Sequence, residues 1–241
     1  MRRPLLVLLV AALAILAPPG VAGAFPFDDQ PWDSSESPHR RIMLVGDSLT
    51  ASSGPAATAL GEQREHAVKV WAISGGTPCD FTAGYGAEAQ PFAPTAVAFA
   101  FVGNADRDCI EAELGWQIDC CLTSSEVAQV VAIYRKHLEA MIAWNKAFGV
   151  ESWLIASPVM AAGTFHGQFT AQLNAMLQSL ATASGAYYSA TARSLLSPAG
   201  TFTSTLAGVP IRNADGVHLR APYGTTLHAL GLLSGPMTGH L

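Results

Sequence analysis

A serine that directly follows a buried strand is the first residue whose position suggests chemistry. Residues 42–45 form an apolar run, typical of a strand buried on both faces of a parallel sheet. Gly46 ends the run, and Asp47 and Ser48 follow where the chain must turn. Open α/β sheets place their ligands at the carboxyl ends of strands, so a hydroxyl here could act as a nucleophile. Gly-Asp-Ser by itself also fits a simple turn, so the interpretation depends on residues elsewhere.

An aspartate and a histidine near the C-terminus could activate that serine. Acyl transfer from an ester needs a nucleophile, a base and donors for the developing oxyanion. His218 is the candidate base, because a histidine side chain ordinarily titrates near neutrality. Asp215 precedes it by three residues, so one loop can carry both side chains. The carboxylate could then hold the imidazole in the required tautomer, although Asp-Gly also predicts a turn.

Four short segments, taken in order, resemble the SGNH (GDSL) hydrolase family. They are GDSLT (46–50), ISGGT (73–77), FVGN (101–104) and DGVH (215–218). The resemblance covers nearly the whole chain after the N-terminal segment. It implies a flavodoxin-like α/β/α fold, a catalytic triad of Ser48, Asp215 and His218, and no metal or organic cofactor.

The resemblance also implies which groups form the oxyanion hole. They are the backbone N–H of Ser48, the backbone N–H of Gly75 and the side-chain amide of Asn104. A glycine lets the backbone approach a ligand closely, and an asparagine amide is a neutral, directional donor. Gly75 is preferred over Gly76, because Ser-Gly-x-Thr is the family pattern.

Two acidic residues beside these motifs are interpreted as supporting residues. Asp47 belongs to the first motif, but we expect it to bond the loop backbone and not to serve as the triad acid. The family usually has an aspartate directly after the asparagine of the third motif. Here Ala105 follows, with Asp106 one position further on. This departure puts in doubt the residues that support the oxyanion hole, but not the donors that form it.

Four cysteines follow the N-terminal segment: Cys79, Cys109, Cys120 and Cys121. In an exported protein an even number indicates two disulfides. A bond between the two adjacent cysteines would be strained, so two arrangements stay open. Cys79 and Cys109 each bond one member of the adjacent pair, or they bond each other. Either cross-link would hold the two segments that carry the expected oxyanion donors, and the spacing does not favour a zinc site.

The N-terminus has the features of a secretory signal peptide over residues 1–24. Arg2 and Arg3 precede an apolar run over residues 5–17, and an Ala-x-Ala site ends at Ala24. The run is shorter than the roughly 20 residues of a spanning helix, although a retained anchor stays an alternative. Residues 25–40 predict an irregular lead-in and residues 41–241 one hydrolase domain, so we expect the mature protein to be secreted or extracytoplasmic.

Composition restricts the partners of this domain. The formal net charge is −5, only 13% of residues are charged, and no Lys/Arg cluster follows the signal. Nucleic acid is therefore not an expected partner. Hydrophobic residues make up 50% of the chain in short runs, which fits a compact globule with no further membrane span.

Strand and helix patterns alternate along the chain. Strands are expected over 42–45, 68–73, 95–102, 153–156 and 186–189. Helices are expected from near Pro55 to about His66, from the capping box of Thr123 and Glu126 to near Gly149, over 169–180, and from Pro222 onward. Residues 77–94 read as a long loop over the site, 105–123 show no period, and His166 could rim the pocket. This alternation predicts a three-layer α/β/α sandwich with a parallel five-stranded sheet.

Three functions are compatible with these residues. The first is a secreted serine esterase that hydrolyses short acyl esters of a carbohydrate, lipid or small molecule. The second is an O-acyltransferase, because GGTPCD and FVGNADRDC resemble the SGNH domains attached to membrane acyltransferases. This chain lacks the membrane half, so transfer to a cell-envelope sugar would need a membrane acyltransferase partner. The third is a non-catalytic binding module that retains the fold.

Overall fold

The computed structural model describes residues 40–118 and 121–239, and the predicted signal peptide and nearly all of the lead-in lie outside them. Within these residues, five parallel strands form a sheet in the order β2-β1-β3-β4-β5. They are β1 (Arg41–Gly46), β2 (Ala67–Ala72), β3 (Ala96–Ala100), β4 (Glu151–Ile155) and β5 (Tyr187–Ser189). The predicted α/β class and parallel sheet are confirmed, and each strand lies within two residues of its expected range.

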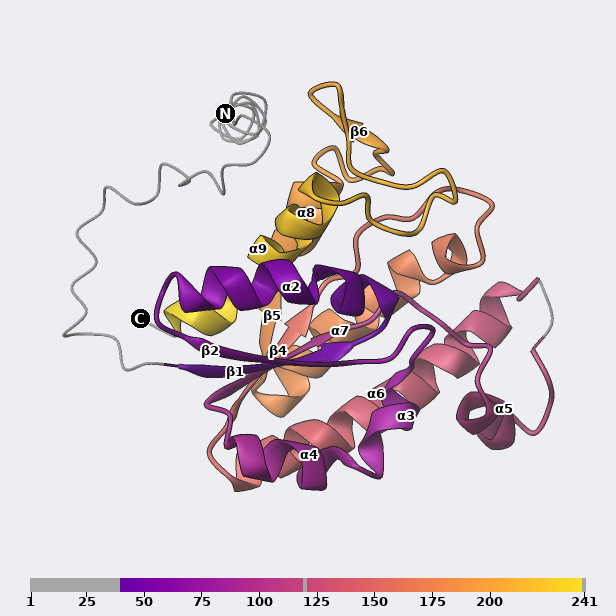
Figure 1. Cartoon of the computed structure of the whole chain (residues 1–241). Helices are drawn as coiled ribbons and strands as arrows, with labels where there is room; N and C mark the ends of the chain where they lie inside the picture. The colour runs from indigo at the N-terminus through magenta and orange to yellow at the C-terminus, as the bar shows by residue number, and fades with distance from the viewer. Residues whose placement is uncertain (1–39, 119–120, 240–241) are drawn as a thin grey trace.

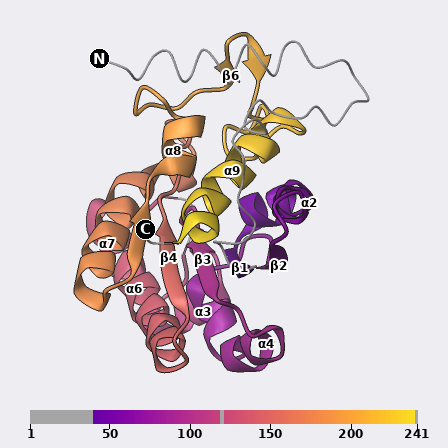
Figure 2. The same ribbon diagram turned by 90° about the vertical axis from the view of Figure 1, so that its left-hand side faces the viewer.

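Helices cover both faces of the sheet, which confirms the three-layer arrangement (Figures 1 and 2). One face carries α2 (Ser48–Glu62), α8 (Thr191–Leu196) and α9 (Tyr223–Thr238). The other carries α3 (Pro78–Thr82), α4 (Tyr85–Phe92), α5 (Asp108–Leu114), α6 (Ser124–Ala147) and α7 (Thr170–Ser184). A short hairpin of β6 (Thr205–Leu206) and β7 (Val209–Pro210) stands beyond the sheet, at the top of Figure 1.

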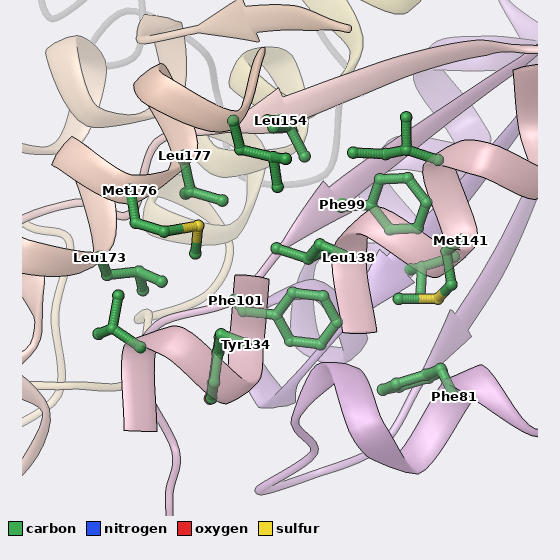
Figure 3. Packing of buried hydrophobic residues seen from close by; sticks show 14 of the residues in the cluster. Phe81, Phe99, Phe101, Tyr134, Leu138, Met141, Leu154, Leu173, Met176 and Leu177 are labelled. Atoms are coloured by element: carbon green, nitrogen blue, oxygen red, sulfur yellow. The ribbon is translucent and has the colours of Figure 1, made fainter. Parts of the chain in front are cut away.

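Two hydrophobic layers lie against the sheet because side chains alternate along each strand. Met43 and Val45 of β1 pack in the larger cluster beneath α6 and α7. Ile42 and Leu44 face the other way, into the cluster beneath α2 and α9. Figure 3 shows the larger cluster, in which Phe99, Phe101, Tyr134 and Leu138 are labelled. Burying a large apolar side chain contributes about 1.5–3 kcal/mol, so these layers stabilise the packing of the helices on the sheet.

The strand order determines where the functional segments meet. From β1 the chain goes to β2 on one side, and β3 then lies on the other side of β1. Doubly wound sheets bind ligands in the crevice at such a reversal of strand order, outside the carboxyl ends of the strands. The segments that follow β1 and β3 therefore lie side by side, and these carry Ser48 and Asn104.

The predicted helix start near Pro55 is wrong, because α2 begins at Ser48 and Pro55 lies inside it. The side chain of Asp47 accepts a hydrogen bond of 3.0 Å from the backbone N–H of Leu49 and so caps the helix. A proline inside a helix costs one backbone hydrogen bond. Burial of one face of α2 against β2 and α9 outweighs that loss.

The long loop expected over residues 77–94 is also wrong, because α3 and α4 occupy most of it. Thr77 and Asp80 form a capping box at the start of α3. These helices have five and eight residues, too few to display a helical period in the sequence. In contrast, the capping box of Thr123 and Glu126 begins α6 as expected. No helix in the described ranges has both the length and the apolarity that a bilayer span requires.

Candidate active site

Ser48 is the first residue of α2, directly after β1. The first backbone N–H groups of a helix have no partner within it, and the helix dipole makes this end favourable for negative charge. The side chain is partly exposed, between the buried Asp47 and Leu49. This position combines an accessible hydroxyl with the favourable electrostatics of a helix N-terminus.

Asp47 connects the start of α2 with the segment that follows β3, as expected of a supporting residue. One carboxylate oxygen accepts from the backbone N–H of Leu49, and the other accepts from that of Val102 at 2.7 Å. Burial raises the pKa of Asp47 to about 7, although these hydrogen bonds lower it. The charge on His218 also lowers this pKa. The residues beside Ser48 and His218 pack together, because Leu49, Val217 and Leu219 share one hydrophobic cluster.

Asp215 and His218 form a hydrogen-bonded pair on one loop. Oδ2 of Asp215 lies 2.8 Å from Nδ1 of His218, and Oδ1 accepts from the backbone N–H groups of Val217 and His218 at 2.9 Å each. Partial burial raises the pKa of Asp215, but these bonds outweigh it and the net shift is downward. An ionised Asp215 fixes the proton of His218 on Nδ1 and leaves Nε2 able to accept another.

The loop that carries this pair is closed at its base. Arg212 and Leu219 pair as an antiparallel bridge, and the guanidinium of Arg212 donates to the carbonyl oxygen of Val217. Within the described residues, the Ser48 hydroxyl makes no hydrogen bond to His218. Catalytic hydrogen bonds often form only when substrate binds, so the lack of this bond is compatible with an acid–base role of His218.

Gly75 and Gly76 differ in what their backbone N–H groups do. The N–H of Gly76 donates to the carbonyl oxygen of Ile73 at 2.8 Å and is therefore already used. Gly75 has a φ of +71°, and a Cβ placed on it would meet no atom within 4 Å. Gly75 also lines a cavity. Of the two glycines, the geometry favours Gly75 as the donor to a ligand.

Asn104 is held on both sides of its amide. Nδ2 donates to the carbonyl oxygen of Gly76 at 3.1 Å and lies 3.3 Å from Oδ2 of Asp47. The opposite atom, Oδ1, lies 2.8 Å from Nε2 of His166. Both Nδ2 hydrogens therefore point toward protein acceptors, and the longer of the two bonds is the one that an oxyanion could most readily share.

The cavity beside these residues has a volume of about 590 Å³. Gly75 and Asn104 line it, together with Arg107, Ile118, Phe165 and His166. Ser48, Asp215 and His218 do not belong to its lining in the described part of the chain. The cavity thus adjoins the expected oxyanion donors, and its wall mixes apolar side chains with polar ones.

A disulfide joins the two segments that carry the expected oxyanion donors. Cys79 in α3 is bonded to Cys109 in α5. The alternative in which each bonds one member of the adjacent pair is therefore wrong. Cys120 lies outside the described residues, so the expectation of a second disulfide stays a prediction. Next to the disulfide, Arg107 makes an ion pair of 2.8 Å with Asp80 and reinforces the same connection.

Two contacts of Asn104 could not be found from sequence patterns. Tyr134 of α6 donates its hydroxyl to the backbone carbonyl of Asn104, and His166 bonds the side chain. In the sequence Tyr134 belongs to the apolar stripe of a helix, and His166 stands in a stretch without period. The expectation that His166 lies at the pocket is confirmed, but the sequence did not predict its hydrogen bond to Asn104.

The fold is that of the SGNH (GDSL) hydrolases, which confirms the predicted resemblance at the level of the fold. The chain belongs to the family described as "Protein of unknown function (DUF459)", whose model matches residues 41–230. A comparison with curated proteins finds no match.

Solved structures with this fold include several acylhydrolases. A GDSL-like lipase from Bacteroides thetaiotaomicron has a TM-score of 0.58 at 15% identity, covering 83% of this chain and 88% of its own. A lipase/acylhydrolase from Enterococcus faecalis has a TM-score of 0.55 at 19% identity, with coverages of 81% and 94%. A catalytic mutant of the acetylxylan esterase Axe2 from Geobacillus stearothermophilus has a TM-score of 0.59 at 14% identity, with coverages of 82% and 94%.

Proposed function

We propose that this protein is a serine esterase that removes short acyl groups from a polar alcohol such as a carbohydrate. The single observation that carries the proposal is the 2.8 Å bond between Asp215 and His218, at the sheet edge where Ser48 begins a helix. The similarity to GDSL lipases and an acetylxylan esterase supports the reaction class.

The residues suggest a reaction in two halves. The hydroxyl oxygen of Ser48 attacks the ester carbonyl carbon while Nε2 of His218 takes the hydroxyl proton. The tetrahedral oxyanion accepts hydrogen bonds from the N–H groups of Ser48, Gly75 and Asn104. Collapse breaks the bond to the alcohol, which leaves with the proton from His218. Water then attacks the acyl-enzyme by the same route, releasing the acid and restoring Ser48.

The cavity favours a small acyl group on a polar alcohol. A long alkyl chain needs a continuous apolar trough, whereas here Ile118 and Phe165 stand among polar residues such as Arg107. Hydrolysis should therefore be fastest with p-nitrophenyl acetate and fall with longer acyl chains. An acyl group that appears on an added sugar instead of as free acid would favour transfer, the second candidate function.

We further propose that the protein acts outside the cytoplasm. The disulfide between Cys79 and Cys109 supports this, because such bonds persist in oxidising compartments. The N-terminal signal is consistent with export, and N-terminal sequencing of secreted protein would test cleavage after Ala24.

Labelling with a fluorophosphonate tests the nucleophile directly. The wild-type protein should be labelled on Ser48, and Ser48→Ala should abolish both labelling and ester hydrolysis. His218→Ala should lower kcat by about 10²–10⁴-fold, the usual contribution of a general base. Ser52→Ala is the matched control, since Ser52 is exposed on the same helix and its hydroxyl bonds the backbone of Leu49. Labelling that persists in Ser48→Ala would contradict the proposal and favour a binding module or another nucleophile.

A further inference from the structure

The segment of residues 161–167 connects the two halves of the candidate active site. At one end the backbone N–H of Ala161 donates to the carbonyl oxygen of Gly216 at 3.1 Å, inside the loop of Asp215 and His218. A Cβ placed on Gly216 would come within 2.4 Å of the Ala161 side chain, so the two segments are in close contact. At the other end His166 bonds the side chain of Asn104.

The neighbours of Asn104 determine which atom donates in this bond. The carbonyl oxygen of Gly76 can only accept, so the amide nitrogen of Asn104 must face it. The amide oxygen therefore faces His166, and Nε2 of His166 must carry a proton and donate it. Burial lowers the pKa of His166, and the charge on His218 lowers it further. A neutral imidazole with its proton on Nε2 is consistent with both observations.

Each contact fixes a different part of Asn104. The hydroxyl of Tyr134 holds the backbone carbonyl, whereas His166 bonds the side-chain oxygen. A donor on the amide oxygen restricts rotation of the amide plane. It also draws electron density from the nitrogen, which makes the N–H hydrogens stronger donors.

We propose that His166 is a positioning residue that orients and polarises the Asn104 amide as an oxyanion donor. This inference rests on the proposed esterase function. This role differs from substrate binding, because His166 acts through Asn104. It affects only the tetrahedral state, in which the carbonyl oxygen of the substrate carries negative charge. Loss of the His166 side chain should therefore lower kcat and leave KM nearly unchanged.

Three variants test this role with p-nitrophenyl acetate as substrate. His166→Phe keeps a flat ring but removes the donor, and kcat should fall by about 10–100-fold with KM changed less than about threefold. His166→Gln keeps an N–H at similar reach and should recover most of the lost kcat. Gln168→Ala is the control, because Gln168 is exposed in the same short helical turn as His166 and its exchange should leave kcat unchanged.

A double-mutant cycle with Asn104→Ala shows whether His166 acts through Asn104. In that background His166→Phe should have little further effect on kcat, since the group it positions is gone. Equal losses in both backgrounds, or a rise in KM with kcat unchanged, would overturn the inference and indicate direct contact with substrate. A circular dichroism melt of each variant checks that it is folded.

A readout independent of activity separates this inference from the proposed function. Nitrogen-15 NMR of the His166 ring should show the proton on Nε2, and the Asn104 side-chain amide signals should move in His166→Phe. A ring protonated only on Nδ1, or unmoved amide signals, would overturn the inference even in an active enzyme. The protein could show both NMR signals as expected and yet have no hydrolytic activity. That result would contradict the esterase proposal but would still support the positioning of Asn104 by His166.

Discussion

At the scale of single residues, the candidate site depends on which polar groups still have donors to offer. The backbone N–H of Gly76 already donates to the carbonyl oxygen of Ile73, whereas Gly75 lines the cavity. The sequence motif already favoured Gly75 over its neighbour, and the turn geometry gives the physical reason. We therefore expect the rate to depend on the backbone conformation at Gly75.

Gly75→Ala should lower kcat by about tenfold or more. A side chain at φ of +71° is strained by about 1–2 kcal/mol, and rotation of the peptide to relieve that strain would displace the N–H. Displacements near 1 Å can cost about 10²-fold in rate. Gly185→Ala is the matched control, because Gly185 has a φ of +76° and equally open surroundings at the end of α7. A similar loss of stability in both variants with unchanged kcat in Gly75→Ala would argue against this donor.

At the scale of elements, short helices and loops position the donors, and these were the hardest parts to predict. The strands were predictable because buried apolar runs are local signals, and α6 because its capping box is local too. The contact between His166 and Asn104 joins residues 62 positions apart, and no periodic pattern records it. The fold and the four motifs could thus be predicted, whereas the contacts that orient them depend on tertiary packing.

The link between α3 and α5 should matter for both stability and rate. The disulfide spans 30 residues, and replacing it in Cys79→Ser/Cys109→Ser should cost about 3–4 kcal/mol of unfolding free energy in the chain-entropy account. We also expect a several-fold lower kcat, measured well below the melting temperature, because the segments carrying Gly75 and Asn104 are no longer tied. Adding dithiothreitol to the wild type should reproduce the loss, and adding it to the double variant should change nothing. Unaltered kcat after reduction would show that the link is structural only.

At the scale of the whole molecule, α2 and α9 are joined by a buried polar pair. Oγ of Ser53 lies 2.9 Å from Nδ1 of His228, and both residues are buried. Burial lowers the pKa of His228 to about 3 from its ordinary 6.5, with a further contribution from Arg212. Between these values the unfolded chain binds a proton that the folded chain excludes, so stability must fall as the pH falls through this window.

His228→Asn should flatten the pH dependence of stability. Asparagine can keep a hydrogen bond to Ser53 but does not titrate. Between pH 6.5 and pH 4 the wild type should lose on the order of 3 kcal/mol more unfolding free energy than the variant. Asp47 acts in the opposite direction, since its raised pKa of about 7 favours the folded state on acidification, but it does so in both proteins. Urea unfolding at several pH values measures the difference, and parallel curves would contradict it.

The arrangement of the site along the chain has a consequence for biogenesis. Ser48 opens α2, whereas Asp215 and His218 come just before α9, and Asn104 follows β3 in between. A partly synthesised or truncated chain that ends before α9 would carry a nucleophile with no stable base beside it. If the protein is the esterase proposed here, an export intermediate that lacks the packing of α9 on α2 should be inactive, so ester cleavage would start only after the whole domain has folded.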